Sequence, residues 1–326
     1  MESAPPEAGL EVACSVLGPL GAMLPIRVIT LGNASAGAAV GFFGGVHGLE
    51  RIGSSVVTAW LASLLGRIRW DEVLAETLQR VRVVFVPIVN PGGMVRGTRA
   101  NPNGVDLMRN APVEAREPVP FLVGGQRISA GLPWYRGRAD EPMEAEAAAL
   151  CGVVRRELLG RKFALALDCH SGFGMRDRLW FPLAYRRTPI PHLPQLHALW
   201  SLFESGNPNH QYVCEPQSRQ YLAHGDLWDF LYLQACETPE RVFLPLTLEM
   251  GSWLWVRKNP RQLFSRHGIF NPQVAHRLGR VMRRHVALFD FALRAAASYD
   301  RWLPGEGAAL RAHREGALSR WYGPGP

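Results

Sequence analysis

The stretch GFFGGVHGLERIG, residues 41–53, places a histidine and a glutamate three positions apart, directly after a glycine-rich apolar run. Such a run predicts a buried strand. Two side chains that can coordinate a metal therefore stand where a strand is expected to end. His47 and Glu50 are either ordinary loop residues or two members of a metal site, and the His-x-x-Glu pattern alone is too short to decide between these interpretations.

The length and composition of the chain limit the class of protein to which it can belong. It has 326 residues, of which 47% are hydrophobic, so it can bury a large core. We expect no membrane span and no secretory signal, because no run approaches about 18 apolar residues and the N-terminus lacks a basic segment followed by an apolar one. Five cysteines without a Cys-x-x-Cys spacing argue against a disulfide framework or a zinc ribbon. These features predict a soluble, cytoplasmic protein with reduced thiols.

The pattern of apolar residues predicts an α/β fold. Strands are expected at residues 24–31, 38–46, 82–89 and 162–169, helices at 53–66, 143–159 and 272–299, and a long loop rich in Pro, Gly and Arg at 110–142. Strands that alternate with helices predict a mixed, mostly parallel central sheet between helices. We expect one domain over residues 1–300 and a partly flexible C-terminal extension over residues 301–326.

The net charge is +8, which favours anionic partners in general. The densest basic cluster is HRLGRVMRRH, residues 276–285, within the last helical pattern. No nucleic-acid-binding motif accompanies this cluster. We therefore interpret it as a solvated helix face and expect no nucleic-acid partner.

Three segments with reactive side chains stand at the ends of predicted strands. Besides His47 and Glu50, His170 follows a strand in LALDCHSGFG, and Glu249 ends the apolar run of VFLPLTLEMGS. Ligands of open α/β sheets bind outside the carboxyl ends of the strands, so these residues can converge. Two imidazoles and one carboxylate make a zinc site with a free fourth position, and Glu249 suits the base that such a site needs. Taken singly, His170 could be a satisfied strand-end histidine and Glu249 the structural partner of an arginine.

The order of these segments resembles the zinc carboxypeptidases, that is, the carboxypeptidase A-like metallopeptidases, and the related succinylglutamate desuccinylase and aspartoacylase group. GGVHGLE resembles the zinc motif of the family, DCHSG the segment of the third ligand, and TLEMG the segment of the general base. The resemblance runs from about residue 40 to residue 250 and implies a zinc carboxypeptidase-like (phosphorylase/hydrolase-like) architecture. It also implies one Zn²⁺ ion held by His47, Glu50 and His170, with Glu249 as the catalytic base.

The stretch NPGGMVRGTRANPNGVDLMRN, residues 90–110, resembles an arginine-bearing block of the same family. On that match Arg99 would stabilise the oxyanion, Arg109 would hold a substrate carboxylate, and Asp106 would accept a hydrogen bond from a ligand imidazole. From the residues alone, Arg109 could equally form an ion pair with Asp106. More distantly, QYLAHGDLWDFLY resembles the segment that supplies a mobile tyrosine, which would be Tyr221.

One departure from the family pattern lies at Met108. The family carries an asparagine at this position, which helps to hold the terminal carboxylate of the substrate, whereas methionine has no N–H to donate. Losing a hydrogen bond to a charged group costs roughly 1.5–3 kcal/mol. Met108 therefore weakens the case for exopeptidase specificity, while the zinc chemistry is preserved.

These features predict a zinc-dependent hydrolase of amide bonds, in first place a metallocarboxypeptidase acting on an anionic peptide or peptide-like substrate. The alternative is an N-acyl amino acid deacylase of the desuccinylase and aspartoacylase type, favoured by the GGVHGLE sequence and the short gap between Arg99 and Arg109. A second alternative is a non-catalytic homologue that binds its ligand without turnover, supported by Met108 alone. The sequence assigns neither the substrate nor the oligomeric state.

Overall fold

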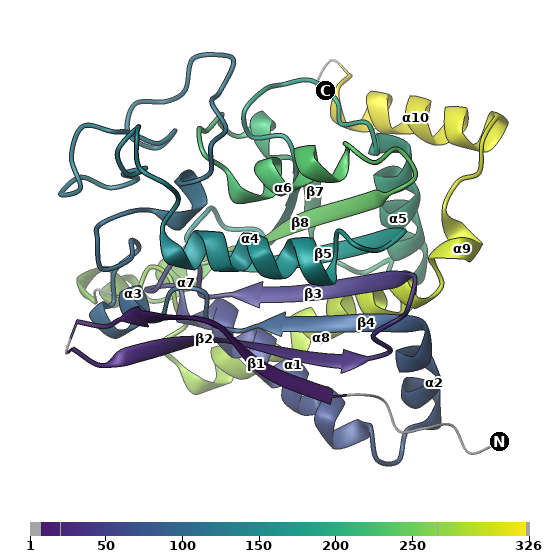
Figure 1. Cartoon of the computed structure of the whole chain (residues 1–326), viewed down its shortest axis with the longest axis horizontal. Coiled ribbons are helices and arrows are strands. Elements are labelled where there is room, and N and C mark those ends of the chain that lie inside the picture. The colour runs from purple at the N-terminus through teal and green to yellow at the C-terminus, as the bar shows by residue number, and fades with distance from the viewer. Residues whose placement is uncertain (1–7, 20, 266, 324–326) are drawn as a thin grey trace.

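The central strands β3 and β5 are buried along their whole length, as their continuous apolar sequences predict. They belong to an eight-stranded sheet in a computed structural model that describes residues 8–19, 21–265 and 267–323 (Figure 1). The strands are β1 (Ala8–Leu17), β2 (Met23–Gly32), β3 (Ala38–Gly44), β4 (Val81–Val86), β5 (Phe163–Ser171), β6 (Arg178–Phe181), β7 (Val213–Pro216) and β8 (Val242–Met250). Their order in the sheet is β1-β2-β4-β3-β5-β8-β6-β7.

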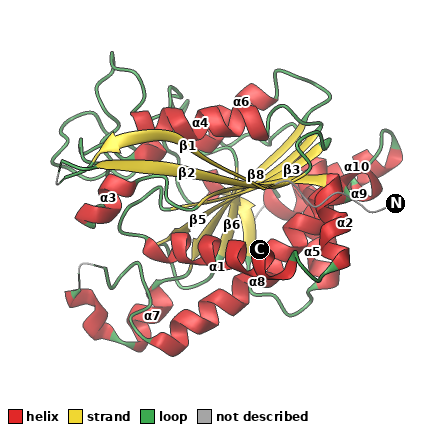
Figure 2. Ribbon diagram, turned by 60° about the horizontal axis from the view of Figure 1, so that its bottom comes forward, coloured by secondary structure: helices red, strands yellow, loops and turns green. Residues whose placement is uncertain are grey.

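Helices cover both faces of this sheet. They are α1 (Arg51–Arg67), α2 (Glu72–Arg80), α3 (Pro91–Arg96), α4 (Ala145–Glu157), α5 (Leu193–Gly206), α6 (Leu227–Ala235), α7 (Trp253–Lys258), α8 (Ala275–Ala297), α9 (Tyr299–Trp302) and α10 (Ala308–Trp321). Three short 3-10 helices are η1 (Leu107–Arg109), η2 (Gln217–Arg219) and η3 (Pro260–Phe264). Figure 2 shows α4 and α6 on one face of the sheet and α1 and α8 on the other. The layers confirm the predicted α/β fold with helices on both sides.

The pairing of the strands is mixed and mostly parallel, as expected. The pairs β3–β4, β3–β5, β5–β8 and β6–β7 are parallel, whereas β1–β2, β2–β4 and β6–β8 are antiparallel. In the β3–β5 pair Gly44 lies opposite Cys169, and in the β5–β8 pair His170 lies opposite Glu249. This register brings the carboxyl ends of β3, β5 and β8 to one edge of the sheet.

The elements expected from the sequence correspond to β2, β3, β4, β5, α1, α4 and α8. The strand expected at residues 82–89 is shorter at its end, because β4 stops at Val86. Pro87 follows and has no N–H to give to a ladder, so the chain leaves the sheet there. The edge strand β1 is a difference from the expected pattern: its sequence is largely apolar, yet most of its residues are exposed.

Residues 110–142 contain no helix or strand, in agreement with the predicted loop, and one isolated bridge joins Gln126 to Tyr135. This loop is tied to the neighbouring segments by its backbone. The carbonyl of Val123 accepts hydrogen bonds from the Arg109 guanidinium, and the carbonyl of Gly124 accepts one from the N–H of His224. The loop therefore reaches the edge of the sheet where β3, β5 and β8 end.

The C-terminal segment after residue 300 packs on the body of the protein through α10. The guanidinium of Arg320 pairs with Glu204 on α5, and the indole N–H of Trp321 donates to the carbonyl of Cys214 at 2.8 Å. The partly flexible extension expected over residues 301–326 stays a prediction, and its last three residues, 324–326, lie outside the described residues.

The five cysteines are all free thiols, as expected from their number and spacing. Among the described residues, no helix is both long enough and apolar enough to cross a membrane.

His285 provides a test of how α8 packs against the rest of the fold. The imidazole is 1% exposed, and its Nδ1 lies 2.8 Å from the hydroxyl of Tyr212. Burial lowers the pKa of His285 to about 4. Because the unfolded chain takes up this proton at a higher pH than the folded one, the free energy of unfolding should fall as the pH drops from about 7 to 4, by roughly 3 kcal/mol for this group.

We expect the His285→Gln variant to lose that part of the pH dependence. Urea unfolding of the parent and the variant across this pH range measures it, and His276→Gln on the exposed face of the same helix is the control. Identical pH slopes for the parent and His285→Gln would show that the buried imidazole does not control stability.

Candidate active site

The turn after β3 brings His47 and Glu50 to the same side of the chain. Gly45 has a φ of +63°, a conformation that favours glycine, and it turns the chain sharply off the strand. The N–H of Glu50 then donates to the carbonyl of His47 at 3.0 Å, and α1 begins at the next residue. Two side chains three residues apart are thereby directed to one point, as the sequence pattern predicts.

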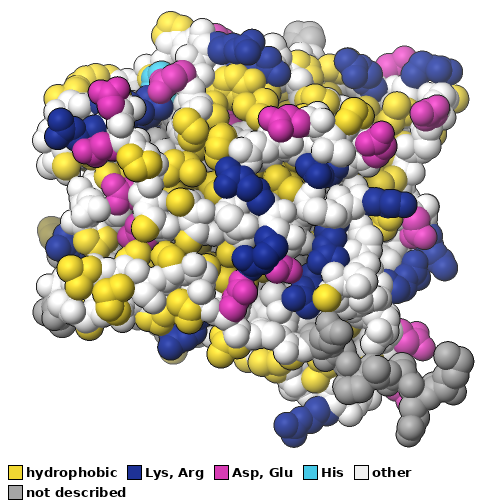
Figure 3. All heavy atoms as spheres, viewed as in Figure 1, with side chains coloured by type: hydrophobic (Ala, Val, Ile, Leu, Met, Phe, Trp, Pro, Cys, Tyr) yellow, Lys and Arg dark blue, Asp and Glu magenta, His cyan; other side chains and the backbone are white. Residues whose placement is uncertain are grey.

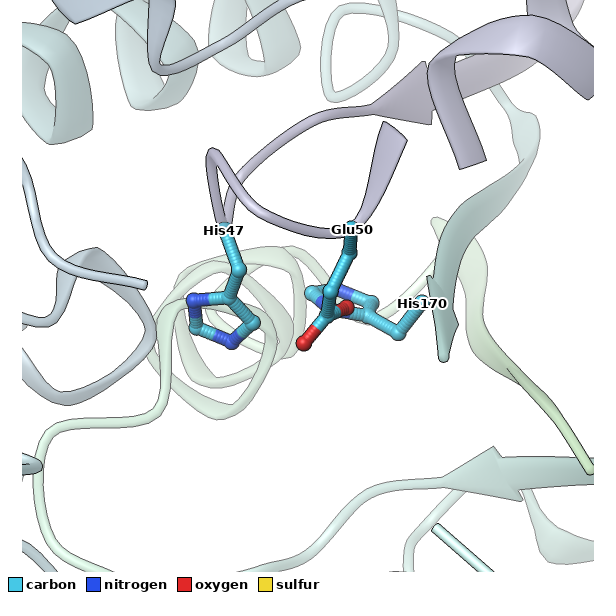
Figure 4. A group of neighbouring side chains, drawn as sticks. All are labelled: His47, Glu50 and His170. Carbon is cyan, nitrogen blue, oxygen red and sulfur yellow. The ribbon is translucent and has the colours of Figure 1, made fainter. Parts of the chain in front are cut away.

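His170 reaches the same point from the end of β5. Figure 4 shows His47 and Glu50 on one loop and His170 on the strand, with the three side chains pointing toward one another. One potential ligand atom from each residue lies within 4.8 Å of the others, and all three side chains are buried. Two imidazoles and one carboxylate in this arrangement could hold a zinc ion.

Close packing fixes the His-x-x-Glu turn in place. A Cβ atom on Gly48 would lie 2.0 Å from the carbonyl carbon of Gly93 in α3, so only glycine allows the two segments to approach. The side chain of Asn271 also holds the turn, since its amide donates to the carbonyl of Leu49 at 2.8 Å and its oxygen accepts from Ile52 N–H at 2.9 Å.

Glu50 is the centre of the hydrogen-bond network. Its Oε2 accepts the N–H of Ser171 at 3.0 Å and lies 3.2 Å from Nδ1 of His170. Its Oε1 accepts from the guanidinium of Arg99 at 3.3 Å. The carboxylate is therefore held on two sides, so its position relative to both imidazoles is defined by the fold.

Asp168 orients His170, and sequence reasoning missed this residue. One carboxylate oxygen lies 2.7 Å from Nε2 of His170 and also accepts the indole N–H of Trp228 at 2.8 Å. This contact leaves Nδ1 of His170 as the nitrogen that faces Glu50 and His47. A carboxylate behind a metal-binding imidazole fixes its tautomer and raises its basicity. The sequence did contain the information needed to find Asp168, because side chains two residues apart on a strand share one face.

The two imidazoles have different protonation equilibria. Burial, assisted by the charge of Arg99, holds the pKa of His47 well below its ordinary value. Burial also acts to lower the pKa of His170, but the carboxylates of Asp168 and Glu50 outweigh it and raise that pKa well above its ordinary value. His47 could therefore bind a metal as a neutral ring, whereas His170 would have to give up a proton to do so.

Glu249 stands at the end of β8, directly across from His170. The side chain is partly buried, and its Oε2 is sealed from solvent without a hydrogen-bond partner among the described residues. Burial raises the pKa of Glu249 to about 8, and Glu50 adds to this shift while His170 and Arg99 oppose it. A nearby cation would lower this pKa and favour the ionised form.

The balance of charge at the site fits a divalent cation. Its carboxyl groups outnumber its guanidinium groups, and unpaired buried charge is costly. The carboxyl groups are Glu50, Asp106, Asp168, Asp226 and Glu249, and the guanidinium groups are Arg99 and Arg109. A divalent cation would reduce this excess of acidic groups.

Arg99 and Asp106 form a pair beside the candidate metal ligands. The Nε of Arg99 donates to Asp106 at 2.7 Å, and a second carboxylate oxygen of Asp106 accepts the N–H of Met108 at 3.1 Å. The expected hydrogen bond from a ligand imidazole to Asp106 stays a prediction, because Nδ1 of His47 lies 3.6 Å from the carboxylate, beyond hydrogen-bond distance. From the sequence, Arg109 was one possible ion-pair partner of Asp106. In the structure Asp106 pairs with Arg99 instead.

Met108, Arg109 and Tyr221 lie together on the other side of the site. The Arg109 guanidinium donates to the carbonyls of Met108 and Val123, and it lies 5.7 Å from the centre of the Tyr221 ring. The hydroxyl of Tyr221 is 3.4 Å from the same guanidinium. Gly225 permits this arrangement, since it has a φ of +70° and a Cβ there would lie 1.8 Å from the carbonyl oxygen of Arg109.

Four further residues line the site and were not identified from the sequence: Trp180, Gln217, Asp226 and Thr247. Asp226 caps α6 through one oxygen, while its Oδ2 is buried without a hydrogen-bond partner in the described part of the chain. The free space among these side chains is about 20 Å³, which is room for one water molecule. A neighbouring hollow of about 330 Å³ opens beyond Arg99, with Leu49 on one wall and residues 130–134 of the long loop on the other.

The contact between Asp168 and His170 leads to a prediction about zinc affinity. Replacing Asp168 by Asn should weaken zinc binding by roughly 10–100-fold, because the imidazole loses the carboxylate that orients it. Competition with a chelator measures the affinity. Trp228→Phe is the matched control, since it removes the other donor to Asp168 and leaves the carboxylate. Parent-like zinc affinity in Asp168→Asn would contradict the role that we assign to this contact.

The similarity of this chain to known proteins agrees with the geometry of the site. Solved structures with the same fold include thrombin-activatable fibrinolysis inhibitor (TM-score 0.61, 18% identity), covering 84% of this chain and 66% of that one. The bovine form of that protein, in complex with tick carboxypeptidase inhibitor, has a TM-score of 0.62 at 17% identity, covering 90% of this chain and 91% of that one.

Carboxypeptidase A from Helicoverpa armigera also shares the fold, with a TM-score of 0.62 and 17% identity, covering 90% of this chain and 70% of that one. The chain thus spans just under two thirds of the first of these structures and more of the other two. At these identities the likeness shows the fold alone, and the search of curated proteins found no significant match.

The sequence itself carries the family assignment. Residues 23–251 match the zinc carboxypeptidase family, and this range includes His47, Glu50, His170 and Glu249. Members of this family use a catalytic zinc, which agrees with the group of three residues that could hold a metal in the structure. The predicted resemblance is confirmed, and the chain belongs to the zinc carboxypeptidase family.

Proposed function

We propose that this protein is a zinc-dependent metallocarboxypeptidase that removes the terminal residue of a peptide or peptide-like substrate. The observation that carries this proposal is the buried group of His47, Glu50 and His170, with Glu249 on the adjoining strand. These residues would hold one zinc ion and supply its base. When bound there, zinc would polarise the amide carbonyl and make a water molecule acidic at neutral pH.

Glu249 is proposed to carry the proton during hydrolysis. Its carboxylate takes a proton from the attacking water and delivers it to the nitrogen of the leaving amine. The sealed Oε2 without a protein partner supports this role, because that oxygen is free for water or substrate. The raised pKa supports it as well, since a base with a pKa close to the working pH transfers protons in both directions.

Arg99 is proposed to stabilise the negative charge that develops on the carbonyl oxygen. The ion pair of its Nε with Asp106 and the contact of its Nη1 with Glu50 fix the guanidinium before substrate arrives. A donor that is already fixed costs no reorganisation during the reaction. Arg99 also borders the hollow of about 330 Å³, which offers room for the part of the substrate that is not released.

Arg109 and Tyr221 are proposed to bind the terminal carboxylate. The contact of 3.4 Å between the guanidinium and the tyrosine hydroxyl is long, so a carboxylate can replace it with a stronger, charge-assisted hydrogen bond. The inner space of about 20 Å³ holds only a water molecule. The leaving residue therefore needs Tyr221 to move aside.

The base assignment gives the main test of the proposed function. Glu249→Gln should bind zinc as the parent does, yet hydrolyse its best substrate roughly 10²–10⁴-fold more slowly, because the proton acceptor is removed. The measurement is zinc content together with turnover of a panel of peptides and N-acyl amino acids by the zinc-loaded protein. If the parent binds no zinc in metal-replete buffer, or if Glu249→Gln is as fast as the parent, the mechanism is wrong.

Met108 gives a second test, directed at specificity. Met108→Asn should lower KM for peptides with a free terminal carboxylate by about tenfold, because asparagine restores a donor worth roughly 1.5 kcal/mol or more. Met108→Leu keeps the apolar character and is the control. Peptides with an amidated terminus should not respond to either change. Equal KM values for Met108→Asn and the parent would show that this position takes no part in recognising the carboxylate.

An N-acyl amino acid deacylase is the second candidate function. The small inner space and the apolar Met108 favour this function, because a compact acyl amino acid needs less room and fewer polar contacts than a peptide chain. Cleavage of N-acyl amino acids alone within the panel would select this function. Binding of panel members in the presence of zinc without any hydrolysis would instead select a non-catalytic ligand-binding homologue.

The remaining expectations about partners and location stand as proposals. We propose an anionic substrate, because Arg99 and Arg109 are the cationic groups that border the site. A cytoplasmic location and the lack of a nucleic-acid partner remain predictions from composition and motifs.

A further inference from the structure

The basic cluster of residues 276–285 lines two hollows beside α8. They have volumes of about 590 and 400 Å³, and they share Asp177, Gln211, Arg280 and Arg284 on their walls. The first hollow continues along residues 206–212, and the second continues to the end of α7. We call the two connected hollows the α8 groove. Volumes of this size are typical of sites for small molecules rather than of flat docking surfaces.

The α8 groove is strongly cationic. Its walls carry five side chains with full positive charge: Lys258, Arg277, Arg280, Arg283 and Arg284. Asp177 is the single carboxylate among the described residues that line it, and Arg284 neutralises that carboxylate with a hydrogen bond of 2.7 Å. The remaining four positive charges face the groove without an acidic counterpart on its walls.

The spacing of these arginines explains why they gather. Arg277, Arg280 and Arg284 recur at intervals of three and four residues, which places them on one face of the helix. Arg280 and Arg283 are exposed, as expected for a solvated helix face, and neither has an ion pair or side-chain hydrogen bond within the described ranges. By contrast, Lys and Arg side chains on the face shown in Figure 3 are interspersed with Asp and Glu.

The groove is also firmly attached to the sheet. Asp177 accepts the N–H of Gly251 at 2.9 Å through the oxygen that does not face Arg284. Gly251 lies two residues beyond Glu249 in the chain. The walls beneath the arginines are buried side chains of Tyr212, Trp255 and His285. These buried walls fix the position of α8, so the arginines extend into the groove from defined positions on the helix.

We propose that the α8 groove binds a small soluble ligand that carries several linked phosphate groups. Guanidinium groups bind phosphate oxygens in pairs of parallel hydrogen bonds, so unpaired arginines suit this chemistry. A single monovalent anion would leave most of the positive charge uncompensated. The recessed shape favours a compact ligand over a membrane surface or a nucleic-acid helix, and nothing in this proposal depends on the hydrolytic activity of the zinc site.

The test uses sodium tripolyphosphate as the probe and isothermal titration calorimetry of the zinc-loaded protein at physiological ionic strength. We expect binding to the parent and at least tenfold weaker binding to the double variant Arg280→Gln/Arg283→Gln. The matched control is Arg311→Gln/Arg314→Gln, which removes two exposed arginines at the same spacing from α10. The control should bind as tightly as the parent.

Each outcome of this titration decides the proposal. Removal of zinc by the probe would appear equally in all three proteins, so the difference between the two double variants reports the groove. No binding to the parent, or equal affinities for both double variants, would overturn the proposal. Binding to vesicles of an anionic phospholipid without binding to tripolyphosphate would also overturn it, in favour of a membrane surface. Circular dichroism of the variants checks that they are folded.

Discussion

The site depends on the hydrogen bonds that tie Glu50 to the end of β5. Glu50 and His47 belong to the turn after β3, whereas Ser171 and His170 belong to β5, more than a hundred residues further along the chain. The parallel register of β3 and β5 brings these two ends together, and Glu50 then accepts the N–H of Ser171. A shift of this register by one residue would turn His170 to the opposite face of the sheet. The geometry of the site therefore depends directly on the pairing of these strands.

The same contacts explain how the protein keeps so many acidic groups inside. Asp168 and Glu50 flank His170, and Asp106 is held by Arg99, so each of these buried carboxylates has a partner. One oxygen of Asp168 and one of Asp226 lack a partner, but the other oxygen of each is hydrogen-bonded, whereas Glu249 makes no side-chain hydrogen bond within the described residues. A buried group of this kind costs free energy in folding, and active sites are where such costs are retained. This carboxyl without a hydrogen bond is the one that we propose as the base.

Much of this arrangement could be predicted from the sequence, because the strands that carry the site are buried and therefore read as apolar runs. The ends of those runs located His47, Glu50, His170 and Glu249. Asp168 was missed although the two-residue period of β5 places it beside His170. Asp226 could not be found in this way, because its role depends on how α6 packs against the site. The edge strand β1 was also missed: its sequence is largely apolar, but most of its residues are exposed, so its pattern does not follow burial.

For helix α8 the sequence pattern predicted the helix correctly but did not reveal the groove beside it. One face carries Leu288, Phe289 and other apolar residues that pack against the sheet, so the helical pattern was clear. Arg277 and Arg284 flank that face and Arg280 and Arg283 lie farther round the helix, and periodicity alone could place them only in solvent. Neighbouring segments that are distant in sequence, residues 206–212 and the end of α7, convert this side of the helix into a groove. Repulsion among its unpaired cations disfavours the empty groove, and a polyanion would relieve it, so the groove should select for charge before shape.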